Sequence, residues 1–253
     1  LARWLKFGAN IGLTYSKYHT ITTGWAEESP ILQAVTGVPY YTPYELIQNE
    51  DGTISYGDVQ LVYPWAANGQ HDLNEYYKHN TNDQVQANLM GQTYFTVTPL
   101  EGLTIRATQA VEAFDFTNSA IARPDYGLQA GITPSRRESF QRYYQLLSTN
   151  TVEYRTDFGT GIHSLTALLG HESMIKNSNS FNAKGEGYTD DRILSFGSAV
   201  NITDWAGGKS ESASNSFFAN FNYSYNGKYF VDASVRTDGS SLFGADHRYA
   251  TFF

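Results

Sequence analysis

Five aromatic residues in one long segment without regular apolar spacing are the strongest candidates in this sequence for binding a ligand. Aromatic rings stack on the apolar faces of sugars, and neighbouring carboxylates such as Glu45 and Asp51 can accept hydrogen bonds from sugar hydroxyls. We therefore predict ligand contact; the alternative is that the rings pack the segment or meet another protein. The five are Trp25, Tyr40, Tyr41, Tyr44 and Trp65.

Two charged residues near the end of the sequence, Asp232 and Arg236, are further candidates for contacting a substrate. They lie four residues apart in a stretch that alternates like a strand, so both side chains point to one face. Asp238 shares that face. The simpler interpretation is that these charges pair with one another or with neighbouring strands.

The sequence offers no arrangement that favours catalysis or metal binding. No Ser/His/Asp set and no paired carboxylates have a suggestive spacing, so we predict neither catalysis nor a cofactor. The 6 His are scattered, and the absence of Cys excludes a thiol nucleophile, a disulfide scaffold and a zinc ribbon. Residues 49–52 have the composition of a calcium loop without its alternate spacing, so we predict a turn and no metal.

Composition narrows the class of protein further. The 253 residues hold 17 basic and 25 acidic side chains, and the net charge of −8 argues against nucleic-acid binding. The 19 Tyr, 15 Phe and 22 Gly are typical of strands and turns. A mean hydropathy of −0.41 suggests a soluble protein. However, strands that are apolar on one face only also average to a polar value, so a membrane β-barrel is compatible with it.

Apolar and polar residues alternate with period two along most of the sequence, which predicts strands. A run of about 9 to 11 such residues, tilted, crosses a bilayer core. The dipeptide Asn226-Gly227 lies between two alternating runs and predicts a tight hairpin turn. The runs cover 5–15, 85–97, 103–113, 163–171, 217–225 and 229–235, with a less regular one over 140–154.

The connections between these runs alternate between long and short. Short ones fall near 99–102, 155–162 and 226–228. An outer-membrane barrel has short periplasmic turns and long extracellular loops, so we predict an all-β, antiparallel transmembrane β-barrel segment. Two alternatives stay open: a soluble surface β-sandwich that binds glycans, and a small closed barrel of eight strands acting as a porin or adhesin. The long connections, predicted to be extracellular loops, are approximately 17–83, 115–139 and 172–214.

The last stretch, SFFANFNYSYNGKYFVDASVRTDGSSLFGADHRYATFF, resembles a barrel hairpin of the SusC/RagA family of TonB-dependent outer-membrane transporters of Bacteroidetes. Residues 4–16, 98–107 and 163–172 are similar to further strands and turns of that family, so the resemblance covers most of the chain. The residues that match the family's pattern are Lys228, Tyr229, Arg236, Asp238 to Ser241, Phe243, Gly244, Arg248, Tyr249 and Phe252.

The resemblance implies a particular architecture. Family members have an N-terminal plug, a TonB-contacting segment and a 22-stranded barrel, and 22-stranded transporters hold a plugged lumen. Here we count seven strands and the start of an eighth at Arg248, without a plug motif. Residues 1–253 therefore resemble the middle of such a barrel, about seven or eight strands of the larger whole, and we expect them to belong to a longer chain.

The resemblance also implies a function. The parent protein would import glycan fragments or peptides across the bacterial outer membrane, energised through TonB, which the absent N-terminal part would contact. A SusD-like surface lipoprotein would close over the barrel as a lid, and outer-membrane lipid would surround it.

All of this depends on one geometric prediction: the apolar side of each strand faces lipid and the polar side faces an aqueous lumen. If instead Phe7, Ile11, Phe221 and Val231 converged on a shared dry interior, the prediction would be wrong. The polar side is predicted to carry Gln84, Gln86, Asn88, Asn220, Asn222, Asp232 and Arg236.

Overall fold

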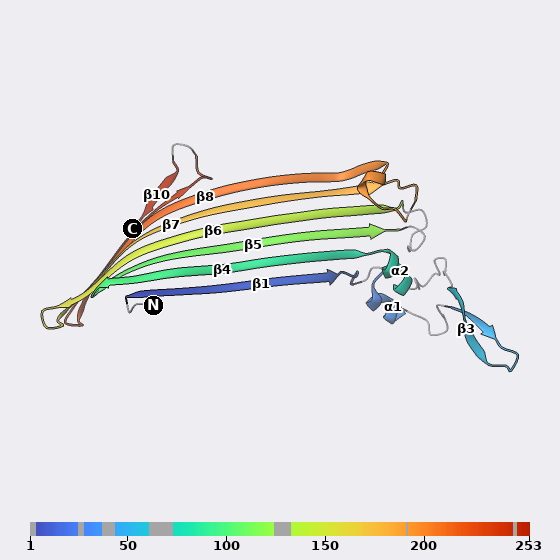
Figure 1. Ribbon diagram of the computed structural model, residues 1–253, viewed down its shortest axis with the longest axis horizontal. Coiled ribbons are helices and arrows are strands. Elements are labelled where there is room, and N and C mark those ends of the chain that lie inside the picture. Colours follow the sequence, from blue (N-terminus) through green and yellow to red (C-terminus); the bar gives the residue numbers. More distant parts are fainter. Residues whose placement is uncertain are drawn as a thin grey trace.

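One antiparallel sheet of eight strands dominates the computed structural model, which describes residues 4–24, 28–36, 44–60, 73–123, 133–190, 192–244 and 247–253. The strands run side by side and curve in the same sense (Figure 1). They are β1 (Leu5–His19), β4 (Asn82–Leu100), β5 (Leu103–Ala122), β6 (Ser135–Phe158), β7 (His163–Glu186), β8 (Asn201–Tyr225), β9 (Tyr229–Ser240) and β10 (Tyr249–Phe252).

Each strand of this sheet pairs with the one that follows it, in the order β1-β4-β5-β6-β7-β8-β9-β10. The pairing of β5 with β6 and of β6 with β7 continues without a bulge from end to end. Residues directly opposite each other in such a ladder share a face of the sheet. This unbroken register carries the alternation of β5 through β6 to β7.

Short turns close one end of the sheet, at 101–102, 159–162 and 226–228. Gly102 has φ +80°, and a Cβ added there would overlap the carbonyl oxygen of Arg155. Asn226 and Gly227 have φ of 52° and 63°. Both central residues of a type I′ hairpin need such angles, so the predicted Asn-Gly hairpin is confirmed.

The opposite end of the sheet carries the longer connections (Figure 1). The first of them contains the helices α1 (Pro30–Thr36) and α2 (Leu73–His79) and a separate hairpin of β2 (Tyr44–Gln48) and β3 (Ile54–Gln60). The β2–β3 connection is a turn, as predicted, closed by a 2.9 Å hydrogen bond from the Gly52 N–H to the Asn49 carbonyl. None of the helices among the described residues is long and apolar enough to cross a membrane.

The predicted boundaries of the long loops, 17–83, 115–139 and 172–214, are wrong. Strands occupy both ends of each of these segments, and the connections between the long strands run only over 20–81, 123–134 and 187–200. The prediction rested on apolar alternation, and this alternation covers only part of each strand. Backbone pairing continues past that point because it needs only a neighbouring strand and not an apolar face.

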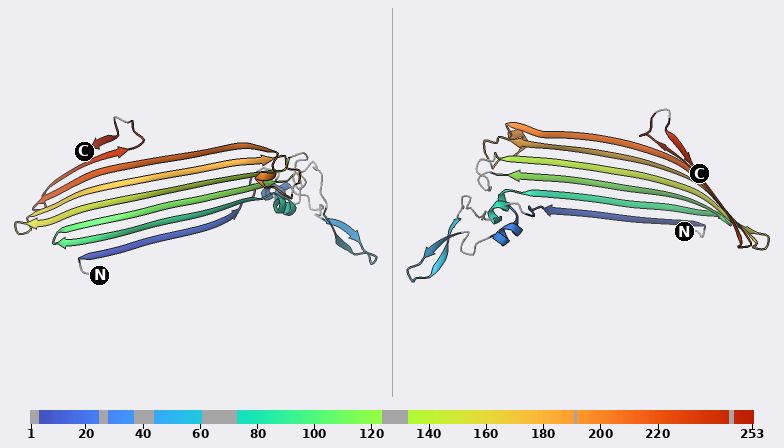
Figure 2. Two further views of the ribbon diagram at one scale, coloured as in Figure 1. Left: turned by 45° about the horizontal axis from the view of Figure 1, so that its top comes forward. Right: turned by 180° about the vertical axis from the view of Figure 1, so that it is seen from behind.

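No second layer of described elements covers either face of the sheet, as both views in Figure 2 show. Phe7, Ile11, Phe221 and Val231 are 47%, 74%, 42% and 54% exposed, so they form no shared dry interior. The soluble sandwich is therefore contradicted. The described residues of β1 and β10 lie at opposite edges without pairing, so the sheet is not a small closed barrel of eight strands either.

Candidate functional site

The two faces of the sheet differ in chemistry along its whole width. One face carries a row of seven apolar residues, paired directly from β1 to β9. Phe7, Ile11, Phe221 and Val231 lie on this same face. The seven are Leu5, Val97, Ile105, Val152, Leu169, Ala219 and Val235.

The opposite face is polar, and the register places all seven predicted lumenal residues on it. This face would line an aqueous lumen, and the apolar face would meet lipid. The polar face is called the lumenal face, and the apolar face is called the outward face.

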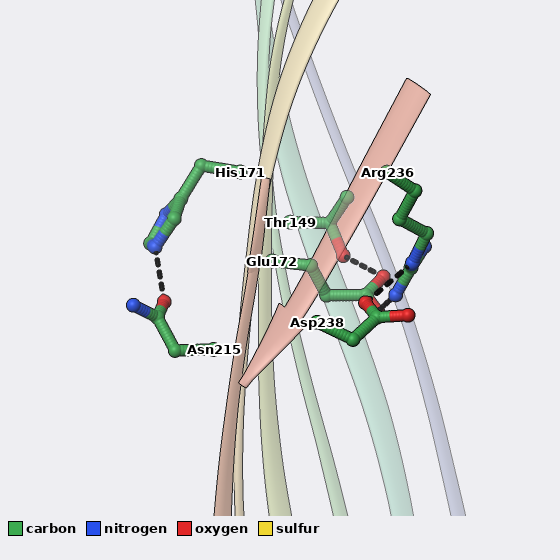
Figure 3. A network of polar contacts seen from close by, with 6 residues as sticks. All are labelled: Thr149, His171, Glu172, Asn215, Arg236 and Asp238. Atoms are coloured by element: carbon green, nitrogen blue, oxygen red, sulfur yellow. Dashed lines mark hydrogen bonds and ion pairs between the residues drawn. The ribbon is translucent and has the colours of Figure 1, made fainter. Parts of the chain in front are cut away.

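Arg236 forms the centre of an ion-pair network on the lumenal face. Its Nε donates to Asp238 Oδ1 at 2.6 Å, and its Nη2 donates to Glu172 Oε1 at 3.1 Å. The other oxygen of Glu172 accepts a 3.4 Å hydrogen bond from the Thr149 hydroxyl. Figure 3 shows these four side chains on one side of the sheet, with His171 and Asn215 on the other. One guanidinium between two carboxylates leaves the network with one surplus negative charge.

A glycine and an aromatic ring position this network. Gly170, Phe218 and Arg236 are directly paired across β7, β8 and β9. The Phe218 ring lies over Gly170, because a Cβ added there would be 2.7 Å from Cε1 and closer still to Cζ and Cε2. The Arg236 guanidinium lies 5.6 Å from the centre of the Phe218 ring, within the range of a cation–π interaction. Glycine at 170 thus makes room for the ring that supports the arginine.

The same arrangement of a glycine, an aromatic ring and an arginine occurs near the β1 edge of the sheet. Gly8 pairs with Tyr94, and a Cβ on Gly8 would overlap the Tyr94 ring. The Arg106 guanidinium lies 4.3 Å from the centre of that ring. The lumenal face therefore holds two arginines, each stacked on an aromatic ring that lies across a glycine.

The structure does not bring the two predicted charged candidates together. Asp232 accepts a hydrogen bond from the Asn222 amide, whereas Arg236 contacts Glu172 and Asp238. The prediction that these charges pair with each other or with neighbouring strands is confirmed for Arg236. Glu172 was missed because it lies 64 positions from Arg236 and within a segment predicted to be a loop. Only knowledge of the strand register would have predicted that Glu172 contacts Arg236.

The aromatic candidates in the first long connection remain predictions. Trp25, Tyr40, Tyr41 and Trp65 lie outside the described residues, and of Tyr44 the structure describes only the backbone, which begins β2.

Two other tyrosines in that connection anchor it beside the sheet. The Tyr77 hydroxyl donates to the Glu28 carbonyl at 2.5 Å and accepts from the Thr22 N–H at 3.0 Å. The Tyr76 ring packs edge-on against Tyr77, with centroids 5.0 Å apart. Burial, with a smaller contribution from the charge of Glu28, raises the pKa of Tyr76 to about 12. These contacts join α2 to Thr22 and Glu28, which precede α1 in the sequence.

The chain is similar in sequence to two receptors of Formosa agariphila, although no protein-family model matches it. It is 28% identical over 221 residues to TonB-dependent receptor P26 and 25% identical over 185 residues to TonB-dependent receptor P39. The matches cover 82% and 68% of this chain. They cover only 21% and 17% of the relatives, so the chain spans about a fifth of their length.

Solved structures agree with these relatives. The RagAB peptide transporter matches 99% of this chain with a TM-score of 0.73 and 25% identity, over 28% of its own length. The RagAB peptide importer in its open-open state matches 100% of this chain with a TM-score of 0.73 and 26% identity, over 27% of its own length. The meander of strands, its two unlike faces and these similarities together indicate that the chain is a segment of an outer-membrane β-barrel similar to those of TonB-dependent receptors and of the RagAB transporter.

Proposed function

We propose that the chain forms part of the wall of an importer that carries oligopeptides or glycan fragments across the outer membrane, with energy delivered through TonB. The observation that carries this proposal is the lumenal face, which is polar across seven neighbouring strands and holds fixed charges of both signs. The similarity to TonB-dependent receptors and to a peptide importer supports the same reading.

The Arg236 network suits the passage of a polar, flexible substrate. Because its charges are paired with one another, it presents hydrogen-bonding groups to the lumen without a strong single-sign field that would trap a charged substrate. Its surplus negative charge attracts the ammonium and guanidinium groups of peptides. The amides of Asn220 and Asn222 on the same face can bind peptide or sugar groups equally well.

The test is uptake by cells that carry the full-length protein. We expect a labelled oligopeptide, a labelled oligosaccharide, or both, to accumulate in these cells, and we expect accumulation to stop when TonB is deleted. A deletion strain without the transporter supplies the background. Accumulation that continues undiminished without TonB would contradict the proposal, as would the absence of uptake for both substrate classes.

The aromatic residues of the first long connection are proposed to contact the substrate at the extracellular end. Replacing Trp25 and Trp65 with Ala is expected to lower uptake at limiting substrate concentration, because each ring offers a large apolar surface for stacking. The matched control is Trp205→Ala, an exposed tryptophan on β8. Unchanged uptake in the Trp25 and Trp65 variants would end this part of the proposal.

A SusD-like lipoprotein is the proposed partner of the extracellular end. The β2–β3 hairpin projects at that end (Figure 1) and exposes Leu46, Ile47, Ile54 and Tyr56 by 44% to 68%. Leu46, Ile54 and Tyr56 share one face of the hairpin, and exposed apolar residues gathered on one face mark protein contacts. We expect Ile54→Ser with Tyr56→Ser to reduce copurification of the lipoprotein with the full-length protein, and Thr53→Ser in the same hairpin to leave it unchanged. Equal recovery with all variants would remove the hairpin from the interface.

A further inference from the structure

A row of charged side chains crosses the outward face of the sheet. Asp115, Arg142, Asn179 and Lys209 are directly paired across β5, β6, β7 and β8. Glu211 is the next outward residue to Lys209 on β8. These five residues are called the outward charged row. Lipid tails reject charge, so a row of this kind needs a position outside the hydrocarbon core.

The outward charged row lies at one edge of the bilayer. Tyr154 and Tyr144 are on the outward face of β6, about ten residues apart, and a tilted strand of that length crosses the hydrocarbon core. Tyrosine is enriched at both membrane surfaces, so this pair marks the two surfaces. Arg142 is the next outward residue after Tyr144, on the side of the long connections. The row is therefore at the level of the lipid headgroups.

Two ion pairs hold the cations of the row along the sheet. Arg142 donates from Nε and Nη2 to Asp115 Oδ2, both at 2.7 Å. Lys209 Nζ lies 2.6 Å from Glu211 Oε1, which also accepts a 2.8 Å hydrogen bond from the Asn177 amide. These contacts use only part of the five donors of a guanidinium and the three of an ammonium. The side chains of Arg142 and Lys209 are 67% and 65% exposed, so the remaining donors can bind a ligand.

A pair of aromatic rings lies beyond the row, further from the bilayer. Phe140 and Phe181 are directly paired across β6 and β7 on the outward face, with ring centres 6.2 Å apart. Phe181 is 44% exposed. Lipid tails do not reach a ring outside the hydrocarbon core, whereas the apolar face of a sugar can stack on it. This part of the outward face therefore offers cations at the bilayer edge and rings above them.

We propose that the outward charged row and the Phe140–Phe181 pair bind the phosphorylated sugar headgroup of a glycolipid in the outer leaflet. Arg142 and Lys209 each bind a phosphate, because charge-assisted hydrogen bonds to phosphate are strong. The two cations lie two strands apart, a spacing of about 10 Å, so a disaccharide with a phosphate at each end would bridge them. The Asn179 amide between them binds sugar hydroxyls.

A phospholipid fits this surface less well. Its single phosphate would engage one cation, and it has no sugar for the rings. The two cations and two carboxylates of the row cancel in net charge, so long-range attraction of any anion is weak and binding depends on short-range contacts. This inference concerns the outward face and does not depend on what the protein transports. A failure of the uptake experiment would leave it intact.

The first experiment measures lipid binding to the full-length protein in mild detergent by native mass spectrometry. The probe is lipid A, an acylated disaccharide with two phosphates. We expect it to bind more tightly than dephosphorylated lipid A or phosphatidylglycerol. A cation beside anionic lipid contributes about fivefold to binding, so Arg142→Gln with Lys209→Gln should weaken binding about 25-fold. The matched control, Lys6→Gln with Lys176→Gln, removes two cations from the lumenal face and should leave binding unchanged.

A single substitution checks the same site without removing a cation. Asn179→Asp places a carboxylate between Arg142 and Lys209 and should weaken lipid A binding several-fold by repelling phosphate. All variants change exposed or partly exposed side chains, so we expect each to keep the heat-modifiable migration of a folded barrel on gels. Absence of lipid A binding, equal binding of the three lipids, or equal losses in the outward and lumenal double variants would overturn the proposal.

The second experiment tests the aromatic rings with the lipid of the native membrane. The full-length protein is purified from outer membranes, and its bound glycolipid is measured from the hydroxylated fatty acids that it releases. We expect Phe140→Ser with Phe181→Ser to retain several-fold less glycolipid than the wild type. Tyr229→Ser, an exposed ring at the short-turn end, should retain as much as the wild type. Equal retention by all three proteins, or none by the wild type, would contradict the proposal.

Discussion

Replacing Gly170 with Ala tests whether the Phe218 ring must lie across β7 for the Arg236 network to form. The added methyl group would be 2.7 Å from Phe218 Cε1 and closer to two other ring atoms, well inside ordinary van der Waals contact. The strand backbone is fixed by pairing on both sides, so the ring has to move. When it moves, Arg236 loses the aromatic surface beneath its guanidinium.

The magnitude follows from the groups involved. Forcing the ring away from its preferred rotamer costs about 0.5–1.5 kcal/mol. The lost cation–π contact removes about 0.5–1 kcal/mol at a partly exposed site. Alanine by itself is about 0.5–1 kcal/mol better than glycine within a strand, which offsets part of this loss. We therefore expect Gly170→Ala to destabilise the barrel by about 1 kcal/mol.

The matched control is Gly12→Ala, also on the lumenal face. A Cβ there would meet only the Met90 carbonyl oxygen at 3.9 Å, so the same substitution should stabilise by about 0.5–1 kcal/mol. The assay is reversible urea unfolding of the full-length protein in lipid vesicles, followed by tryptophan fluorescence. The two variants should shift the midpoint in opposite directions. Equal shifts would refute the steric argument, whereas Gly170→Ala with Phe218→Leu should recover the part of the loss that comes from the displaced ring but not the cation–π contribution.

Three further predictions address the faces, a turn and a loop. Leu169→Arg should destabilise the barrel by about 2–4 kcal/mol in the same urea assay, because the side chain faces the bilayer interior; Leu168→Arg on the lumenal face should cost much less. Gly227→Val should cost about 1–2 kcal/mol, because φ of 63° is left-handed, and a shift no larger than the scatter of repeated wild-type midpoints would contradict this. Hydrogen bonds from the Arg192 side chain and backbone lower the pKa of Asp190 to about 2 from 3.8. A group with a lowered folded-state pKa contributes stability above its unfolded pKa, so this local contact should be complete above pH 3.8 and lost as pH falls through about 2. Carboxyl-carbon NMR should follow the titration, and its midpoint should move towards 3.8 in Arg192→Ala.

The sequence predicted the strands and their faces well because a bilayer imposes a strict rule on side chains. Lipid accepts apolar groups only, so residues such as Leu165, Ala167 and Leu169 alternate with polar neighbours wherever β7 crosses the membrane. The Asn226-Gly227 turn was predictable for a different reason: few residues adopt two successive positive φ angles.

The ends of the strands were not predictable from the same signal. Beyond Ile175, β7 continues to Glu186 through residues that are mostly polar on both faces. Its pairing there depends on the backbones of β6 and β8, which no local pattern reveals. The same limit hid the contact of Glu172 with Arg236, since two residues far apart in sequence meet only through the register of the strands between them.

The length of the strands has a consequence for the cell surface. A strand of 24 residues such as β7 extends about 80 Å, whereas a tilted crossing of the hydrocarbon core needs only about 10 residues. More than half of the strand therefore stands clear of the bilayer as hydrogen-bonded wall. The barrel wall would therefore continue beyond the membrane surface, and its hydrogen-bonded strands would keep the rim rigid at a distance from the bilayer.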